Sequence, residues 1–299
     1  MSDAAILPLR FQVGARTLAA IPRRLVRVSY SLREALAGKV AVIGPPTLGS
    51  DGFLVTSLPE DQLERVAGAR LLRHVRQRYM RYYVDLSTGI AGWELALSSA
   101  TRSGLKRKAK KLAAASGGKL DIRRYASADE IATFHPLARS VSALTYQERL
   151  LDAGLPSDIG ELVRLAAAGR VRAWLLFVEG RPVAYLCCTA DGDTLRYDFV
   201  GHDPAVASLS PGVVLQAEAL RDLMAEGRFR WFDFTEGEGQ HKRSLATGGV
   251  ACVDLLLLRP TLSNRVALGA LGGFDRAMAL AKRAAAHSAL ARLSRQVRR

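Results

Sequence analysis

Carboxylate, imidazole and ammonium side chains gather in the stretch WFDFTEGEGQHK, residues 231–242. Asp233 stands inside an aromatic run, Glu236 follows in a glycine-bounded loop, and His241 and Lys242 come next. Carboxylates and imidazoles are the side chains that most often move protons in enzymes. A buried aspartate costs folding free energy unless it is paired. Asp233 is therefore expected to have either a partner, most often an arginine, or a chemical purpose.

A second group of candidates lies upstream, where a strand is expected to lead into a helix. Ser208, Ser210 and Gly212 surround Pro211, and His202 precedes them. The start of a helix presents free backbone N–H groups and the positive end of its dipole to an anion. The turn is thus a candidate phosphate site, although the same residues also form ordinary helix caps and turns.

The elements that must position these residues follow from the hydrophobic pattern. Three runs of branched and aromatic residues, separated by short glycine-containing turns, predict an antiparallel meander. Glycines and polar loops then delimit a helix, a strand, a short helix and a last strand. The predicted strands are 171–179, 181–190, 194–200, 229–234 and 250–258, and the predicted helices are 212–226 and 240–246.

The flanking segments are rich in basic residues. A basic helix is predicted at residues 101–115, and an alanine-rich basic helix is predicted for the tail, residues 261–299. The other predicted elements are helices at 59–72, 127–137, 146–153 and 159–168 and strands at 79–86 and 120–125. We expect three segments, 1–120, 121–260 and 261–299.

Composition narrows the class of protein. The 299 residues include 43 Lys and Arg against 28 Asp and Glu, a net charge of +15, which attracts nucleic acid, anionic lipid or nucleotide phosphates. Cys187, Cys188 and Cys252 are interpreted as reduced core residues, the first two on opposite faces of a strand. The histidine spacings predict no metal site. Signal-peptide and membrane-spanning patterns are absent, so a cytoplasmic location is expected.

The strand order and three motifs resemble the GNAT superfamily of acyltransferases. The closest resemblance is to its CelD-type branch, associated with polysaccharide biosynthesis and related to FemAB-type aminoacyl transferases. The motifs are Ser210-Pro211-Gly212, Phe232-Asp233-Phe234 and Lys242, with the basic helix, residues 102–111, before them. His241 stands where that branch usually has tyrosine, and a single glycine, Gly212, remains of the usual pyrophosphate loop.

The resemblance covers residues 80–258 and implies an α/β (α+β) fold, with a central mixed, mostly antiparallel sheet flanked by helices. Residues 121–260 would form the acyltransferase core, and residues 1–120 a candidate second GNAT-like half. The implied reaction moves an acyl group from acyl-CoA, or from an acyl carrier protein, to an amine. No permanently bound cofactor is implied.

The implied reaction assigns roles to the candidate residues. The amine must lose a proton, so a carboxylate or an imidazole is expected as base, and a tyrosine could protonate the leaving thiolate. Backbone N–H groups in the third strand of the meander are expected to hold the oxyanion. The expected catalytic residues are Glu236, Asp233, His202, His241, Tyr197 and Tyr185. The expected donor-binding residues are Phe199, Val200, Ser208, Ser210, Gly212 and Lys242.

Each of these assignments has a structural competitor. Tyrosines in such positions are more often strand packing residues, and Glu236 could be a solvated loop charge. Lys242 could neutralise Asp233 or Glu236 instead of meeting substrate.

The basic segments favour an anionic membrane surface, with Leu268, Leu271 and Phe274 expected to enter the interface. The expected acceptor is then a lipid amine, such as a sphingoid base or an aminolipid, or an amino sugar on a lipid-linked precursor. Some bacterial ceramide synthases resemble GNAT proteins. The alternatives are a FemAB-like aminoacyl transferase and a non-catalytic binder of polyanions. Nucleic acid is not the expected partner, because no stacking aromatics accompany the basic residues.

Overall fold

The computed structural model describes residues 4–13, 16–39, 43–66, 71–145, 154–237 and 239–297. Packing divides the chain into two compact units. Unit 1 comprises Met1–Arg78 and Cys252–Arg299, and unit 2 comprises Tyr79–Ala251. The boundaries fall within strands β4 (Leu72–Asp85) and β10 (Gly248–Leu258). The division into segments 1–120, 121–260 and 261–299 remains a prediction.

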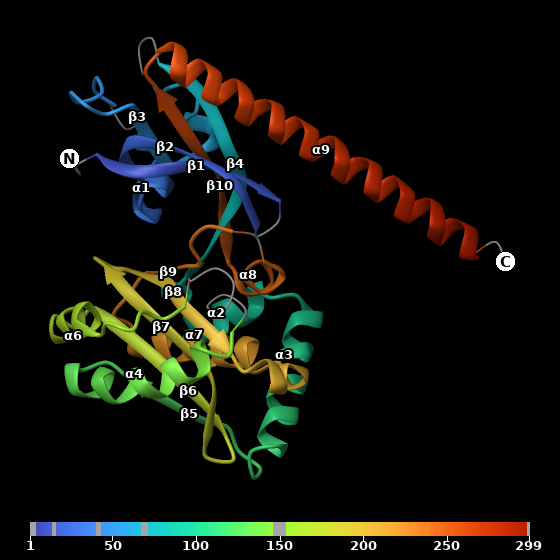
Figure 1. Cartoon of the computed structure of the whole chain (residues 1–299). Helices are drawn as coiled ribbons and strands as arrows, with labels where there is room; N and C mark the ends of the chain where they lie inside the picture. The colour runs from blue at the N-terminus through green and yellow to red at the C-terminus, as the bar shows by residue number, and fades with distance from the viewer. Residues whose placement is uncertain are drawn as a thin grey trace. The chain divides into compact units, whose positions relative to one another are not determined.

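Unit 2 is built on a mostly antiparallel sheet with the strand order β4-β9-β8-β7-β6-β5 (Figure 1). Besides β4, the strands of this sheet are β5 (Asp121–Tyr125), β6 (Val171–Val178), β7 (Arg181–Asp191), β8 (Thr194–His202) and β9 (Trp231–Asp233). Strands β5 to β8 pair antiparallel, whereas β8 and β9 pair parallel. The predicted meander and the predicted mixed, mostly antiparallel sheet are confirmed.

Helices cover both faces of this sheet. The core on one face lies under α2 (Gly89–Ala96), α3 (Ser99–Ala114) and α7 (Pro211–Glu226). The core on the other face lies under α4 (Ala128–Ser142) and α6 (Gly160–Ala167). Two short elements complete the unit, the 3-10 segment η3 (Pro204–Leu209) and helix α8 (Gln240–Leu245).

The cysteines confirm the predicted alternation. Cys188 belongs to the core under α7, and its neighbour Cys187 belongs to the core under α4. Both are buried and free, as is Cys252. Successive side chains of a strand point to opposite faces, so β7 is buried on both sides.

Strand β8 changes its partners along its length. Its register with β7 shifts between Cys187 and Cys188, which leaves Asp198 as an extra residue of a β-bulge. The Asp198 carboxylate accepts hydrogen bonds from the N–H and the hydroxyl of Thr189 and thereby holds the bulge. On its other edge, β8 pairs with β9 only as far as Arg196. From residue 197 onward β8 therefore continues without β9 beside it.

Unit 1 has the strand order β1-β2-β3-β10. Its elements are β1 (Ala5–Val13), β2 (Arg16–Ser29), α1 (Leu32–Leu36), β3 (Gly52–Pro59) and α9 (Leu262–Val297). Residues 16–36, which include five arginines, are thus mainly strand. Leu25, Leu256 and Leu258 are buried in a core that also includes Leu271 of α9.

The structure corrects the predicted membrane role of three apolar side chains of the tail. Leu271 is fully buried in unit 1, and Leu268 packs against the same core. Phe274 makes an edge contact with Phe11, with ring centroids 5.5 Å apart. These side chains pack on the sheet because it offers them an apolar face. In the described part of the chain, no helix combines the length and the hydropathy needed to cross a bilayer.

The helix predicted at residues 59–72 is wrong. Among the described residues of this range, 59–66 and 71–72, only the 3-10 turn η1 (Glu60–Gln62) is helical, and Leu72 already begins β4. The acidic residues start a local turn, and residues 63–65 continue as turn without becoming a regular helix, so helix propensity does not decide this segment. The helix predicted at residues 146–153 lies outside the described residues.

Candidate functional site

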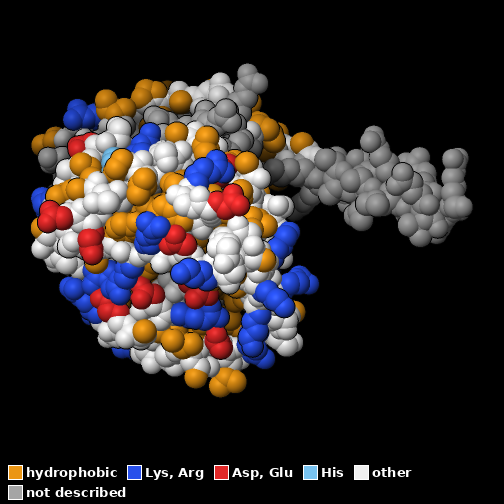
Figure 2. Space-filling model, turned by 90° about the horizontal axis from the view of Figure 1, so that it is seen from below, with side chains coloured by type: hydrophobic (Ala, Val, Ile, Leu, Met, Phe, Trp, Pro, Cys, Tyr) orange, Lys and Arg blue, Asp and Glu red, His pale blue; other side chains and the backbone are white. Residues whose placement is uncertain are grey.

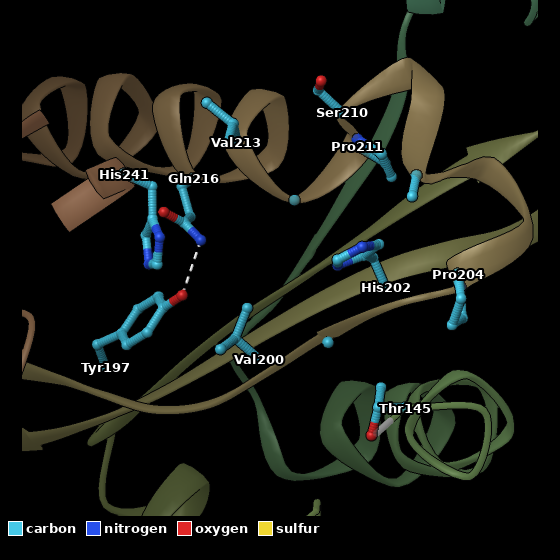
Figure 3. Close-up of a pocket in the computed structure, with 13 residues that line it drawn as sticks. Thr145, Tyr197, Val200, His202, Pro204, Ser210, Pro211, Val213, Gln216 and His241 are labelled. Atoms are coloured by element: carbon cyan, nitrogen blue, oxygen red, sulfur yellow. Dashed lines mark hydrogen bonds between the residues drawn. The ribbon is translucent and has the colours of Figure 1, made fainter. Parts of the chain in front are cut away.

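A cavity of about 540 Å³ opens in unit 2 between the second half of β8 and the start of α7 (Figure 3). Its walls are mostly apolar side chains, with tyrosine, histidine and glutamine among them. The residues that line it are Thr145, Tyr197, Val200, Gly201, His202, Pro204, Ala207, Ser210, Pro211, Gly212, Val213, Gln216 and His241. Six of the predicted site residues therefore meet here: Tyr197, Val200, His202, Ser210, Gly212 and His241.

The start of α7 forms one wall of the cavity. Ser210 takes a left-handed conformation (φ 56°, ψ 46°) that turns the chain into the helix, and Pro211 occupies the first turn. No side chain caps this helix start, so the first N–H groups of α7 remain available to an anion. A Cβ on Gly212 would lie 3.6 Å from Nδ1 of His202. The absence of a side chain at Gly212 thus keeps the space beside the imidazole open.

The edge of β8 supplies a backbone donor. The N–H of Asp203 bonds to the carbonyl of Val183 on β7 at 2.8 Å, and the register runs on through residues 201 and 199. Bonding directions alternate along an antiparallel strand, so the N–H of Phe199 points toward β7. The N–H of Val200 points to the opposite edge, which β9 does not cover. Of the two predicted oxyanion positions, Val200 alone lines the cavity.

Three polar side chains lie together at one end of the cavity (Figure 3). Nε2 of Gln216 donates a hydrogen bond of 2.7 Å to the hydroxyl of Tyr197. The rings of Tyr197 and His241 lie 6.4 Å apart. The second polar atom of each partner, Oε1 of Gln216 and Nε2 of His241, is buried and makes no hydrogen bond within the described residues. We call Tyr197, Gln216 and His241 the open polar group.

Burial tunes the titration of this group. Desolvation lowers the pKa of His241 below its usual 6.5, and the nearby Lys242 ammonium adds to the effect. Desolvation raises the pKa of the Tyr197 hydroxyl. At neutral pH the imidazole is therefore uncharged and able to accept a proton, while Tyr197 keeps its proton.

Asp233 has the arginine partner that its burial required. Its carboxylate is fully buried and makes two bonds to Arg81 of β4, from Nε at 3.1 Å and from Nη2 at 2.5 Å. Oδ1 also accepts the N–H of Thr235. Asp233 does not line the cavity. The Arg81–Asp233 pair instead links β4 to β9 and has a structural role.

Lys242 and Glu236 also lie outside the cavity lining. Nζ of Lys242 donates to the carbonyls of Phe234 and Glu236, at 2.8 and 2.6 Å, and lies 5.8 Å from the centre of the Tyr197 ring. Burial lowers the pKa of this ammonium. The side chain of Glu236 is exposed. The side chain of Lys242 thus holds the loop after β9 by hydrogen bonds to backbone carbonyls of that loop.

The remaining predicted residues point elsewhere. Tyr185 is buried on the α4 face, where its hydroxyl bonds to Ser142. Ser208 is exposed, and its carbonyl accepts a hydrogen bond of 3.0 Å from Lys111 of α3. Gln216 was not among the residues predicted from the sequence, although a polar residue between Leu215 and Ala217 on a buried helix face was an available signal. Within the described residues, no group of three or more His, Cys, Asp or Glu side chains could hold a metal ion.

Comparison with known proteins bears on the fold and on the class of protein. Residues 99–243 match the model of a family described as "Acetyltransferase (GNAT) domain". The protein has a GNAT fold. The match runs from the basic helix α3 into α8 and includes every predicted site residue. This likeness supports a transferase. A search of curated proteins gave no match.

Several solved structures are similar to this chain. The C-terminal domain (DUF2156) of a putative lysylphosphatidylglycerol synthetase from Agrobacterium fabrum is similar, with a TM-score of 0.51 and 11% identity, over 74% of this chain and 71% of that chain. L-PGS from Bacillus licheniformis has a TM-score of 0.45 and 13% identity, over 76% and 74%. A GCN5-related N-acetyltransferase from Kribbella flavida has a TM-score of 0.40 and 17% identity, over 78% and 75%.

Proposed function

We propose that the protein is an N-acyltransferase that moves an acyl group from a thioester to an amine in the cavity between β8 and α7. One observation carries the proposal. An uncapped helix start, a free backbone N–H of β8 and an uncharged imidazole border the same cavity. These are an anion site, an oxyanion donor and a base, which together are what amine acylation needs.

The donor in this proposal is acyl-CoA or an acyl carrier protein, both of which present phosphate. The start of α7 is suited to phosphate. Lys111 joins the basic helix α3 to the loop that precedes α7. Helix α3 contains six Lys and Arg and no acidic residue, and Lys and Arg gather at the right-hand edge of the face in Figure 2. The acyl chain would then lie against the apolar cavity walls.

The chemical step needs no covalent enzyme intermediate. The amine nitrogen attacks the thioester carbonyl, a C–N bond forms, and the oxyanion accepts the N–H of Val200. His241 takes the proton of the amine, with His202 as the other imidazole within the cavity. The C–S bond then breaks and the thiolate leaves with the electron pair. Because a thiol ionises near pH 8.5, the thiolate leaves without a proton from Tyr197.

The acceptor in this proposal is an amine of a lipid, such as a sphingoid base or an aminolipid, or an amino sugar of a lipid-linked polysaccharide precursor. The supporting observation is the basic surface, together with Leu262, Val266 and Leu280, which α9 leaves 79%, 64% and 65% exposed. Such residues suit the cytoplasmic face of an anionic membrane. A lipid amine or a lipid-linked amino sugar is also the acceptor that the resemblance to CelD-type proteins and to ceramide synthases would imply.

A polyanion-binding function is the second candidate, because Lys106, Arg107 and Lys110 of α3 are exposed. It would include an aminoacyl-tRNA donor, as in a FemAB-like transferase, or a scaffold without catalysis. Binding of this kind would weaken steeply with salt and would not depend on His241.

Release of free thiol by the purified protein tests the proposal. Acetyl-CoA and palmitoyl-CoA are offered against sphingoid-base, amino-sugar and polyamine acceptors. Acceptor-dependent release with one chain length supports the reaction and identifies the donor class. No release with any pair, together with tight and salt-sensitive RNA binding, would overturn the acyltransferase and favour the second candidate.

A further inference from the structure

The open polar group contains two atoms that are prepared for a ligand. Gln216 is 4% exposed, and its Oε1 has no partner within the described residues. Nε2 of His241 is likewise buried and has no hydrogen-bond partner within the described residues. Buried polar atoms in folded proteins are nearly always hydrogen-bonded, because an unmade bond costs free energy. The cavity therefore holds two buried atoms whose partners must come from a ligand or water.

Gln216 is oriented with its amide nitrogen toward the hydroxyl of Tyr197. The amide nitrogen donates a hydrogen bond of 2.7 Å to the hydroxyl oxygen of Tyr197. The carbonyl oxygen, Oε1, is therefore the end of the amide without a partner. Figure 3 shows the side chains of Gln216 and His241 next to each other above the Tyr197 hydroxyl. A carbonyl oxygen accepts hydrogen bonds only. The ligand group at this end must therefore carry an N–H or O–H.

The charge of the cavity restricts that ligand further. None of the thirteen lining residues is Asp, Glu, Lys or Arg. The ammonium of Lys242 lies against the ring of Tyr197, 5.8 Å from its centre. A ligand ammonium bound there would lose its hydration and meet this second positive charge, with no carboxylate among the lining residues to compensate it. The open polar group thus disfavours a cation and accepts an uncharged donor.

We propose that the open polar group binds the acceptor amine in its uncharged form, with one N–H donated to Oε1 of Gln216 and a second directed at Nε2 of His241. This inference rests on the proposed acyl transfer. As the amine nitrogen forms the C–N bond and the C–S bond breaks, the proton on the second N–H passes to His241. Gln216 is then a binding residue that selects acceptors with one isolated amine.

Selection against a second charge follows from the same contacts. A diamine of equal chain length brings an additional ammonium toward a cavity without a carboxylate. Wild-type protein should therefore use the monoamine with kcat/KM higher by about tenfold or more. The Gln216→Glu variant keeps an acceptor atom but adds a negative charge, so it should reduce or reverse this preference.

The kinetic test measures thiol release with the alkyl monoamine and the matching diamine. Gln216→Leu should lower kcat/KM for the monoamine by about tenfold or more, since it removes the N–H acceptor. The KM for the acyl donor should not change. A double variant, Gln216→Leu with Tyr197→Phe, repeats the test without leaving the tyrosine hydroxyl unpaired. Unchanged acceptor kinetics in these variants, or a wild-type preference for the diamine, would overturn the inference.

A binding test separates failure of this inference from failure of the proposed reaction. The side-chain amide signal of Gln216 is assigned in a ¹⁵N NMR spectrum by its loss in Gln216→Leu. The probe is an alkyl monoamine whose pKa is brought near neutral by an electron-withdrawing substituent, because amide protons exchange too fast to observe near pH 10. The signal should shift when this amine is added above its pKa, and not below it. If the wild type releases no thiol, the proposed reaction fails while this titration still decides the amine site. Equal shifts with charged and uncharged amine, or no shift, would overturn the inference.

Discussion

Two buried polar clusters of unit 2 differ in one respect. In the Arg81–Asp233 pair, both carboxylate oxygens have partners, and the pair lies outside the cavity. In the open polar group, one atom of Gln216 and one atom of His241 have none within the described residues, and both residues line the cavity. A closed cluster stabilises the fold, whereas an open one is available for a ligand. Burial alone therefore does not identify a functional residue.

The largest expected effect breaks the closed cluster. Asp233→Ala leaves the guanidinium of Arg81 buried without its carboxylate, so the free energy of unfolding should fall by about 3–5 kcal/mol. Urea denaturation measures this loss. The matched control is Glu161→Ala, which removes an exposed partner of Arg164 and should change stability by less than about 1 kcal/mol. Equal losses in the two variants would contradict the structural role of Asp233.

Removing the imidazole of the open polar group should lower activity strongly and stability only slightly, the reverse of what is expected for Asp233→Ala. His241→Ala should lower kcat/KM for acyl transfer by about 10²–10³-fold, because a general base is lost, while unfolding free energy changes little. His202→Ala is the control within the same cavity and should act mainly on the KM for the donor. A larger fall in kcat for His202→Ala would move the base to that residue.

Close packing under the cavity gives the next effect. A Cβ on Gly201 would lie 2.6 Å from Cε1 of Tyr185 and 2.7 Å from Cγ2 of Thr145, so Gly201→Ala should cost about 1–3 kcal/mol. Gly104→Ala is the matched control, since nothing lies within 4 Å of its Cβ position. In helix α3 that change should stabilise by about 0.5–1 kcal/mol. Thermal denaturation of both variants should show shifts of opposite sign.

A pH profile sharpens the assignment of His241. Its folded-state pKa lies below the unfolded value of 6.5, so the unfolded chain binds the additional proton between these values. Stability should therefore rise with pH across that window. The step that His241 contributes to the pH profile of kcat/KM should also lie below pH 6.5, since the imidazole must be uncharged to act. The groups beside it are Tyr197, Gln216 and Lys242. An acidic limb that persists in His241→Gln would contradict the assignment.

The smallest expected effect concerns the exposed loop. Glu236→Gln should leave kcat/KM within about twofold of wild type, because the side chain is exposed and does not line the cavity. Parallel thiol-release assays measure this. A loss of a hundredfold would return the base to Glu236.

The sequence was sufficient for much of unit 2. Glycine-bounded runs of branched residues located the meander, and the apolar pattern with its flanking glycines located α7 and α8. The prediction of a helix at 59–72 was wrong because the acidic residues start only a local turn, and the residues described directly after it are turn and not helix. Leu271 and Phe274 were placed at a membrane because amphipathicity does not say which apolar surface a helix will cover.

The candidate site was harder to derive from the sequence than the fold. His241 and Gly212 were found because their types and their neighbours suggested chemistry. Asp233 and Gln216 could not be separated, since each is a polar residue in an apolar context, and only the position of Arg81 distinguishes a closed cluster from an open one. Arg81 and Asp233 are 152 residues apart in the chain. No short-range sequence pattern therefore predicts the pair.

The central claim is that transfer takes place in the cavity between β8 and α7. A bulky side chain at Gly212 would occupy the space beside His202, whereas Ser208 is exposed and outside the lining. Thiol release is therefore measured for Gly212→Phe and Ser208→Phe, with circular dichroism to verify folding. The account predicts that Gly212→Phe loses acceptor-dependent release and that Ser208→Phe keeps it. Full release by folded Gly212→Phe would contradict the account.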